Sequence, residues 1–112
     1  MFVARSGSLA ERSSPFEVIH TTGSSQVATM VLSPGESAGA YGTEHPQSDQ
    51  ALLVVTGKAR AVVEGKEEAL GAGDFLLIEA GERHSVLNCG EATLVMLTWY
   101  APPAYDDQGD PL

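Results

Sequence analysis

GDFLLIEAGERHSVLN, residues 73–88, contains two short apolar segments separated by a turn. FLLI (75–78) and HSVLN (84–88) are rich in the branched and large apolar side chains that favour β-strands. The intervening AGER carries Gly81, and glycine accepts the positive φ of tight turns at no steric cost. Two strands joined by a turn are therefore predicted here, and the same alternation continues in both directions along the chain.

Short segments of the same kind recur on either side, each bounded by turn-forming residues. Turn signals at intervals of about eight to twelve residues are typical of an all-β sandwich or barrel. The Glu64-Gly65 pair predicts a tight hairpin between two of these strands. The remaining predicted strands are FEVIH (16–20), QVATMVLS (26–33), QALLVVTG (50–57), KARAVVEG (58–65), KEEAL (66–70) and ATLVMLTWYA (92–101).

The length of 112 residues predicts one domain, residues 1–112. Residues 1–15 are expected to form a loose arm or an added edge strand. The Pro-rich acidic tail, residues 102–112, is expected to leave the sheet and lie on the surface. The start of the chain is too polar for a secretory leader. The single cysteine, Cys89, excludes an internal disulfide, which fits a cytoplasmic location.

The charge balance argues against polyanionic partners. Fifteen acidic residues face six basic ones, the net charge is -9, and the basic residues are scattered along the chain. Without a basic cluster, a nucleic acid or an anionic membrane surface would be repelled. No apolar run approaches the length of a membrane span. We therefore expect neither nucleic acid nor membrane as a partner.

A polar cluster directly precedes one of the apolar strands, in TEHPQSDQALLVVTG, residues 43–57. Residues two apart on a strand share a face, so His45 and Gln47 can both point inward, and Gln50 can join them after a short break. His84 opens a later strand and can approach from the neighbouring side. The alternative is that His45 is a turn histidine bonded to the backbone and that the glutamines are ordinary polar lining.

Two spaced patterns carry a resemblance to a known family. Residues 39–57 read G-x5-H-x-Q-x2-Q-x6-G, and residues 73–88 read G-x5-E-x-G-x2-H-x3-N. They resemble the two motifs of the cupin superfamily, G-x5-H-x-H-x3,4-E-x6-G and G-x5-P-x-G-x2-H-x3-N. The second pattern departs only at Glu79, where proline is usual. The first has Gln47 in place of the second histidine and Gln50 in place of the glutamate.

The H-x-x-x-D-Q form of residues 45–50 is similar to a branch of single-domain cupins, the cupin 2 type of conserved barrel. The resemblance implies an all-β fold, the double-stranded β-helix or jelly-roll cupin barrel of two antiparallel sheets, which is often dimeric. In the family the motif positions hold a divalent metal in the barrel mouth, which implies His45, Gln47, Gln50 and His84 as candidate ligands. Family reactions include dioxygenation and isomerisation of small polar molecules.

The two glutamines leave the function open. Imidazole suits zinc, nickel and iron, whereas an amide oxygen is a neutral ligand, and a buried cation without matching negative charge is expensive. Unless Asp49 or Glu44 contributes a carboxylate, the site is weaker than a typical one. One interpretation is a cupin that binds zinc, nickel, iron or manganese and acts as a dioxygenase or isomerase of a small molecule. The other is a metal-free small-molecule-binding cupin with a sensory or accessory role.

Three further residues flank the two patterns and are candidates for the ligand pocket: Tyr41, Asp49 and Arg83. Arg83 would suit a carboxylate, while a surface position, and a turn-capping role for Asp49, remain alternatives. The run ALLVV (51–55) does not alternate between apolar and polar residues, so both of its faces are predicted to be covered. The outer cover is either a second copy, in a homodimer, or the N-terminal arm.

Overall fold

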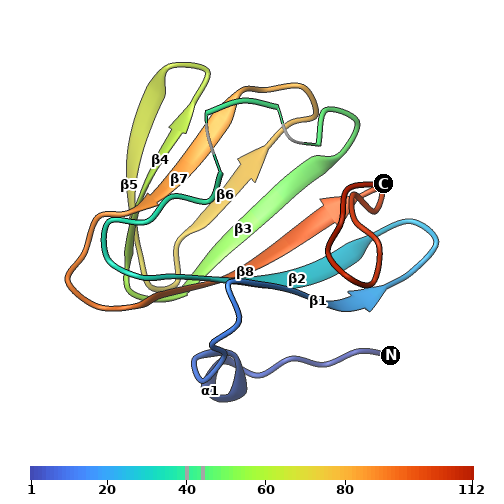
Figure 1. The fold of residues 1–112 in the computed structure, drawn as a ribbon, viewed down its shortest axis with the longest axis horizontal. Helices are drawn as coiled ribbons and strands as arrows, with labels where there is room; N and C mark the ends of the chain where they lie inside the picture. The colour runs from blue at the N-terminus through green and yellow to red at the C-terminus, as the bar shows by residue number, and fades with distance from the viewer. Residues whose placement is uncertain (40, 44) are drawn as a thin grey trace.

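The structure, a computed structural model, describes residues 1–39, 41–43 and 45–112, and consists of two antiparallel sheets (Figure 1). The larger sheet has the strand order β1-β2-β8-β3-β6, and the smaller has the order β5-β4-β7. The larger sheet comprises β1 (Phe16–Thr21), β2 (Gln26–Leu32), β3 (Asp49–Thr56), β6 (Phe75–Ile78) and β8 (Leu94–Ala101). The smaller comprises β4 (Lys58–Val63), β5 (Lys66–Gly71) and β7 (His84–Asn88).

The strands confirm the all-β fold class expected from the sequence. Each predicted apolar segment forms a strand, with ends that agree to within one or two residues. The hairpin between β4 and β5 turns at Glu64 and Gly65, whose φ angles are 47° and 78°. Positive φ at both central residues is the geometry whose twist matches that of the flanking strands.

The hydrophobic core lies between the two sheets. Leu52 and Val54 of β3 and Met96 of β8 are fully buried against Ala61 of β4 and Val86 of β7. Because successive side chains on a strand point to opposite faces, the same strands present a second set of residues outward. The core occupies one part of the space between the sheets, and a cavity, described below, occupies another.

The outer face of the larger sheet is apolar at β3, β6 and β8. The strand registers place Leu53 opposite Phe75, and Ala51 opposite both Leu77 and Trp99, so these five side chains share that face. Phe75, Leu77 and Trp99 are 63%, 51% and 38% exposed. The expectation that both faces of ALLVV are covered is therefore met only in part within the described chain.

Both ends of the chain carry more structure than the sequence indicated. Residues 6–9 form a one-turn helix, α1 (Ser6–Leu9), rather than an edge strand, and Leu9 is buried. The arm before it reaches β1, where Phe2 stacks on His20 with ring centroids 4.7 Å apart.

No helix in the described ranges is long and apolar enough to cross a membrane.

The tail after β8 does leave the sheet, but it folds back beside the ends of β2 and β8 (Figure 1). Tyr105 pairs with Pro111 in an isolated bridge, and Gly109 packs on the ring of Phe16. The buried side chain of Gln26 holds the tail backbone through hydrogen bonds to Ala104 and Tyr105. The tail is thus attached to the barrel, and two of its residues, Tyr105 and Gly109, line the cavity.

Candidate functional site

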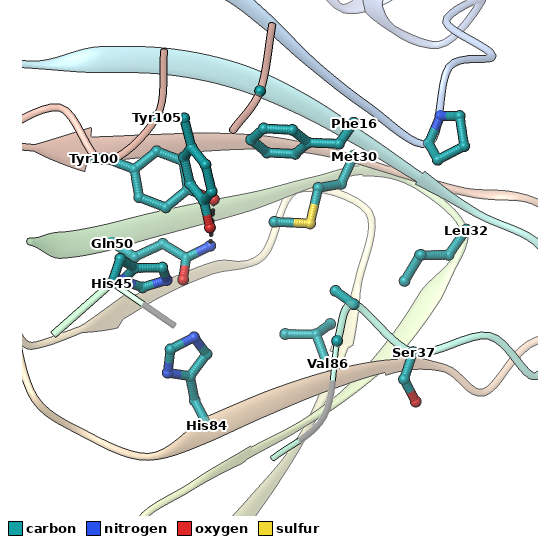
Figure 2. Close-up of a pocket in the computed structure, with 14 residues that line it drawn as sticks. Phe16, Met30, Leu32, Ser37, His45, Gln50, His84, Val86, Tyr100 and Tyr105 are labelled. Carbon is teal, nitrogen blue, oxygen red and sulfur yellow. Dashed lines mark hydrogen bonds between the residues drawn. The ribbon is translucent and has the colours of Figure 1, made fainter. Parts of the chain in front are cut away.

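A cavity of about 350 Å³ opens between the sheets (Figure 2). Apolar side chains from β1, β2 and β7 line its body: Phe16, Met30, Leu32 and Val86. Three polar side chains, His45, Gln50 and His84, lie together at one end. Among the described residues that line the cavity, none is Asp, Glu, Lys or Arg. The cavity is therefore an uncharged, largely apolar space with one polar end.

Main-chain pairing brings the two histidines together although they are far apart in the sequence. The segment between β2 and β3 runs along β7, where the N–H of Ala38 donates to the carbonyl of Val86 at 2.9 Å. Gly42 and His84 then exchange two backbone hydrogen bonds, at 3.0 and 3.1 Å. The chain reaches His45 three residues later. The rings of His45 and His84 lie with centroids 4.8 Å apart, and the residues are 8% and 9% exposed.

Gln50 reaches the cavity from β3, and its neighbours on β8 determine which way its amide points. The side-chain nitrogen donates to Thr98 Oγ1 at 2.8 Å and to the Tyr100 hydroxyl at 3.4 Å. Thr98 Oγ1 donates its own hydrogen to the carbonyl of Ala51 at 3.3 Å, so it can only accept from Gln50. The amide oxygen must therefore point the other way. It is buried and has no hydrogen-bond partner among the described residues.

The histidine tautomer follows from a similar argument. Nδ1 of His84 lies 2.9 Å from the carbonyl oxygen of Glu82, which can only accept, so Nδ1 carries the proton. Nε2 of His84 then holds a lone pair, as a metal-binding imidazole requires. Burial lowers the pKa of His45 below its ordinary value, and the nearby His84 ring lowers it further. The lowered pKa favours the neutral form of the His45 ring.

Gln47 does not join these three residues, and the reason is local. Residues 45–48 form a turn closed by the Ser48 N–H and the His45 carbonyl at 3.1 Å, and β3 begins only at Asp49. The alternation of a strand therefore does not apply between His45 and Gln47. Gln47 is exposed and lines a separate hollow together with Pro102 and Leu112.

The flanking candidates lie on the surface with partners of their own. Tyr41 is 44% exposed, and its hydroxyl accepts from the N–H of Gly65 at 3.1 Å. Asp49 accepts from the N–H of Ala80 at 2.9 Å, so it bonds the distant turn after β6 rather than its own turn. Arg83 pairs with Glu64 at 3.1 Å, and the hydrogen bond from the backbone N–H of Arg83, followed by this side-chain contact, lowers the pKa of the glutamate.

Glu44, the other carboxylate considered from the sequence, lies outside the described residues. Asn88, the last residue of the second pattern, has a structural role. Its amide nitrogen donates to the carbonyls of Leu32 and Ala92, and its amide oxygen accepts from the N–H of Gly90. Asn88 therefore ties the end of β7 to β2 and to the turn that follows.

Several residues of the cavity wall were not proposed from the sequence as site residues. Tyr100 shares the inner face of β8 with Thr98 and Met96, so strict period-two alternation along the last strand would have indicated it. Phe16 carried only the ordinary signal of an apolar strand residue. Tyr105 lies in the tail, where no periodic pattern operates, and nothing in the sequence pointed to it.

These wall residues form a continuous row of rings (Figure 2). From His45 the row passes to Tyr100 at a centroid distance of 5.0 Å, then to Tyr105 at 5.2 Å and to Phe16 at 4.9 Å. His84 extends it at the polar end. The row gives the cavity one largely aromatic side that connects its polar end to its apolar end.

With this fold and site described, the class of protein is clear. Residues 28–100 match the family described as Cupin domain, and the chain therefore belongs to the cupin family. The two antiparallel sheets form its jelly-roll barrel. A protein of Myxococcus xanthus named Endoribonuclease YbeY is 37% identical over 71 residues, which are 63% of this chain but 23% of that protein. The activity in that name is not carried over to this chain.

Solved structures support the same fold. The crystal structure of BH2720 from Bacillus halodurans is 25% identical and has a TM-score of 0.87, over 99% of this chain and 86% of that one. A structure from Thermotoga maritima described as a predicted oxalate decarboxylase is 27% identical, with a TM-score of 0.64 over 72% and 69% of the chains. A sugar phosphate isomerase from Silicibacter pomeroyi is 22% identical, with a TM-score of 0.64 over 72% and 52%, which shows the fold alone.

Proposed function

We propose that this cupin binds a divalent metal through His45, His84 and Gln50, next to a small organic molecule held in the apolar part of the cavity. The observation that carries the proposal is the buried amide oxygen of Gln50, which has no hydrogen-bond partner in the described chain. Leaving such an acceptor unpaired costs about 1–3 kcal/mol. A cation, or a donor group of a ligand, would remove that cost.

The donor set supports a metal of the borderline class. Two neutral imidazoles and an amide oxygen suit zinc, nickel, iron or manganese, and they leave coordination positions for water or a ligand. No group of three or more His, Cys, Asp or Glu side chains converges in residues 1–39, 41–43 and 45–112, so the amide of Gln50 is the candidate for the third ligand among these residues. We leave Gln47 out of the set because it is exposed.

For the reaction we propose dioxygenation or isomerisation of a small molecule. When bound, a metal here would serve as a Lewis acid or as an oxygen-binding site. The row of rings would orient the apolar body of the substrate. Phosphosugar isomerisation is disfavoured, because a phosphate would need a cationic partner, and Lys and Arg are absent from the described lining of the cavity.

A second candidate is a metal-free binding module with a sensory or accessory role. The neutrality of the three donors favours it, since neutral side chains can orient an uncharged ligand by hydrogen bonds alone. The amide oxygen of Gln50 would then accept from a hydroxyl or N–H group of that ligand.

Metal binding by the untagged protein separates the two candidates. Protein freed of metal is titrated with zinc, nickel and manganese by calorimetry, alongside the variants His45→Ala and His84→Ala. His20→Ala is the matched control, because this third histidine is exposed on β1. The metal-binding proposal expects one metal per chain, loss of binding in both site variants, and wild-type binding in the control. Absence of binding in the wild-type protein would favour the metal-free module.

We also propose a homodimer in the cytoplasm. On the outer face of β3, β6 and β8, Phe75, Leu77 and Trp99 are exposed, and the strand registers add one charged residue, Asp49, at the start of β3. On a chain of net charge -9, two copies would associate through this largely apolar surface with the least repulsion. The free and exposed thiol of Cys89 is compatible with a reducing compartment.

A further inference from the structure

The charge of the candidate site does not balance that of a divalent metal. His45 and His84 are buried and would bind a metal as neutral imidazoles, and the amide of Gln50 carries no charge. Two carboxylates of the described chain lie close to these residues in sequence, and both are engaged elsewhere. Asp49 accepts from the N–H of Ala80, and Glu82 accepts from the N–H of Glu79 at 2.7 Å. The described protein thus contributes no negative charge to the metal.

This imbalance has an energetic consequence. Moving a cation from water into a buried site is unfavourable unless opposite charge accompanies it. Polar lone pairs compensate for part of the lost hydration but leave the net charge unchanged. Metal binding without a counter-charge should therefore be weak, and an anion bound at the same end of the cavity would strengthen it.

The rest of the cavity limits what that anion can be. A volume of about 350 Å³ suits a molecule of about one ring, since it lies near the lower end of the range for small-molecule sites, about 300–1,000 Å³. The aromatic row that ends at Tyr105 and Phe16 offers flat contact surface, and Met30 and Val86 add apolar contacts. A flat molecule with an apolar body and a negatively charged end would satisfy both parts of the cavity.

We propose that the ligand of this site is a small planar anion with two adjacent oxygen atoms and an apolar body, and that it supplies the negative charge that His45, His84 and Gln50 lack. The adjacent oxygens would bind the metal together, and the apolar body would lie along the row of rings. This inference rests on the metal site proposed above and names the class of molecule that the site takes.

Reciprocal coupling follows from this arrangement. If the anion raises the affinity for metal by some factor, the metal raises the affinity for the anion by the same factor. Couplings between linked binding sites are commonly about 5–150-fold. We expect at least about fivefold here, because the two partners share one buried site rather than acting over a distance.

The experiment measures zinc affinity by calorimetry in the absence and presence of three probes, with correction for zinc bound by each probe in solution. Salicylate is planar and anionic and has two adjacent oxygen donors. Salicylamide is its uncharged counterpart of nearly the same shape, and oxalate is an anion with adjacent oxygens but no apolar body. We expect salicylate to tighten zinc binding by at least about fivefold, and salicylamide and oxalate by less than about twofold.

Gln50→Glu tests the origin of the coupling, since it supplies the missing charge from the protein. Zinc alone should then bind at least about tenfold more tightly, which corresponds to about 1.4 kcal/mol, and the salicylate effect should fall below about twofold. Gln108→Glu is the matched control, because it adds the same charge at an exposed position. It should behave as the wild-type protein does in every titration.

The outcomes separate this inference from the proposed function. If zinc binds neither alone nor in the presence of any of the three probes, the metal site itself is refuted. If zinc binds the wild-type protein and salicylate does not tighten it, the metal site stands and the anion inference is wrong. An equal effect of salicylamide refutes the role of charge, and an equal effect of oxalate refutes the role of the apolar body. Salicylate that binds equally well with and without zinc also refutes the coupling.

Discussion

The attachment of the C-terminal tail through Gln26 gives a prediction that can be worked out from the hydrogen bonds. The side-chain nitrogen of Gln26 donates to the carbonyl of Tyr105 at 2.7 Å, and its oxygen accepts from the N–H groups of Ala104 at 3.2 Å and Tyr105 at 3.1 Å. Gln26 is 1% exposed. Replacement by Leu removes these three bonds to the tail, and also the bond from the same nitrogen to Thr21 Oγ1 at 3.0 Å, with little change in side-chain volume.

The expected cost follows from these contacts. Each bond contributes about 0.5–1.5 kcal/mol net, so a tail that stays docked would lose about 3 kcal/mol. For a domain of this size that loss lowers the melting temperature by roughly 10 °C. If the tail instead undocks, its backbone groups regain water, and what is lost is the docking energy. That energy includes the ring contacts of Tyr105 with Tyr100 and Phe16, about 0.5–1.5 kcal/mol each.

Two measurements distinguish these cases in Gln26→Leu. Thermal unfolding reports the global loss, and hydrogen exchange of residues 102–112 reports local undocking. Undocking also removes Tyr105 from the cavity wall. Zinc-dependent salicylate binding should then weaken severalfold, while zinc binding without salicylate stays within about twofold. Gln108→Leu, at an exposed position of the same tail, is the control and should change none of these quantities.

One result would refute the reasoning. If Gln26→Leu leaves the melting temperature within 1–2 °C, roughly the effect of a surface substitution, and the tail amides exchange as slowly as in the wild-type protein, Gln26 does not hold the tail. The ring contacts of Tyr105 with Tyr100 and Phe16 would then be what keeps it in the cavity wall.

Two further predictions concern the surface and the pH. Leu77→Arg places a charge on the exposed face of β6 and should convert a dimer to a monomer in light scattering, whereas Val3→Arg, in the exposed arm, should leave the dimer intact. A monomeric wild-type protein would refute the dimer. The lowered pKa of His45 means that the unfolded chain binds more protons below about pH 6.5, its unfolded value. Stability should therefore be full above that pH and fall as the pH drops through the folded pKa, by up to about 1.4 kcal/mol per unit. Urea unfolding of metal-free His45→Gln should lack this part of the slope, and identical pH profiles would mean that His45 is not buried in its neutral form.

The sequence predicts a site residue's position well when neighbouring residues determine it, and poorly when residues far along the chain do. Gln50 was proposed as a site residue, but the direction of its amide depends on Thr98 and Tyr100, which lie about fifty residues further along the chain. Gln47 was expected to share a face with His45 because a strand was assumed there. The chain forms a turn instead, and the two side chains diverge.

The sequence alone determined the order and extent of the strands, since alternation and turn residues act over a few neighbouring positions. The hairpin at Glu64 and Gly65 belongs to the same class of local information. The cupin resemblance added the expectation that His45 and His84 lie in one barrel mouth. Only the tertiary structure decided that Tyr105 of the tail closes the cavity and that the amide oxygen of Gln50 is left unpaired within it. Both depend on contacts between distant segments, which strand register and packing select and which no short stretch of sequence encodes.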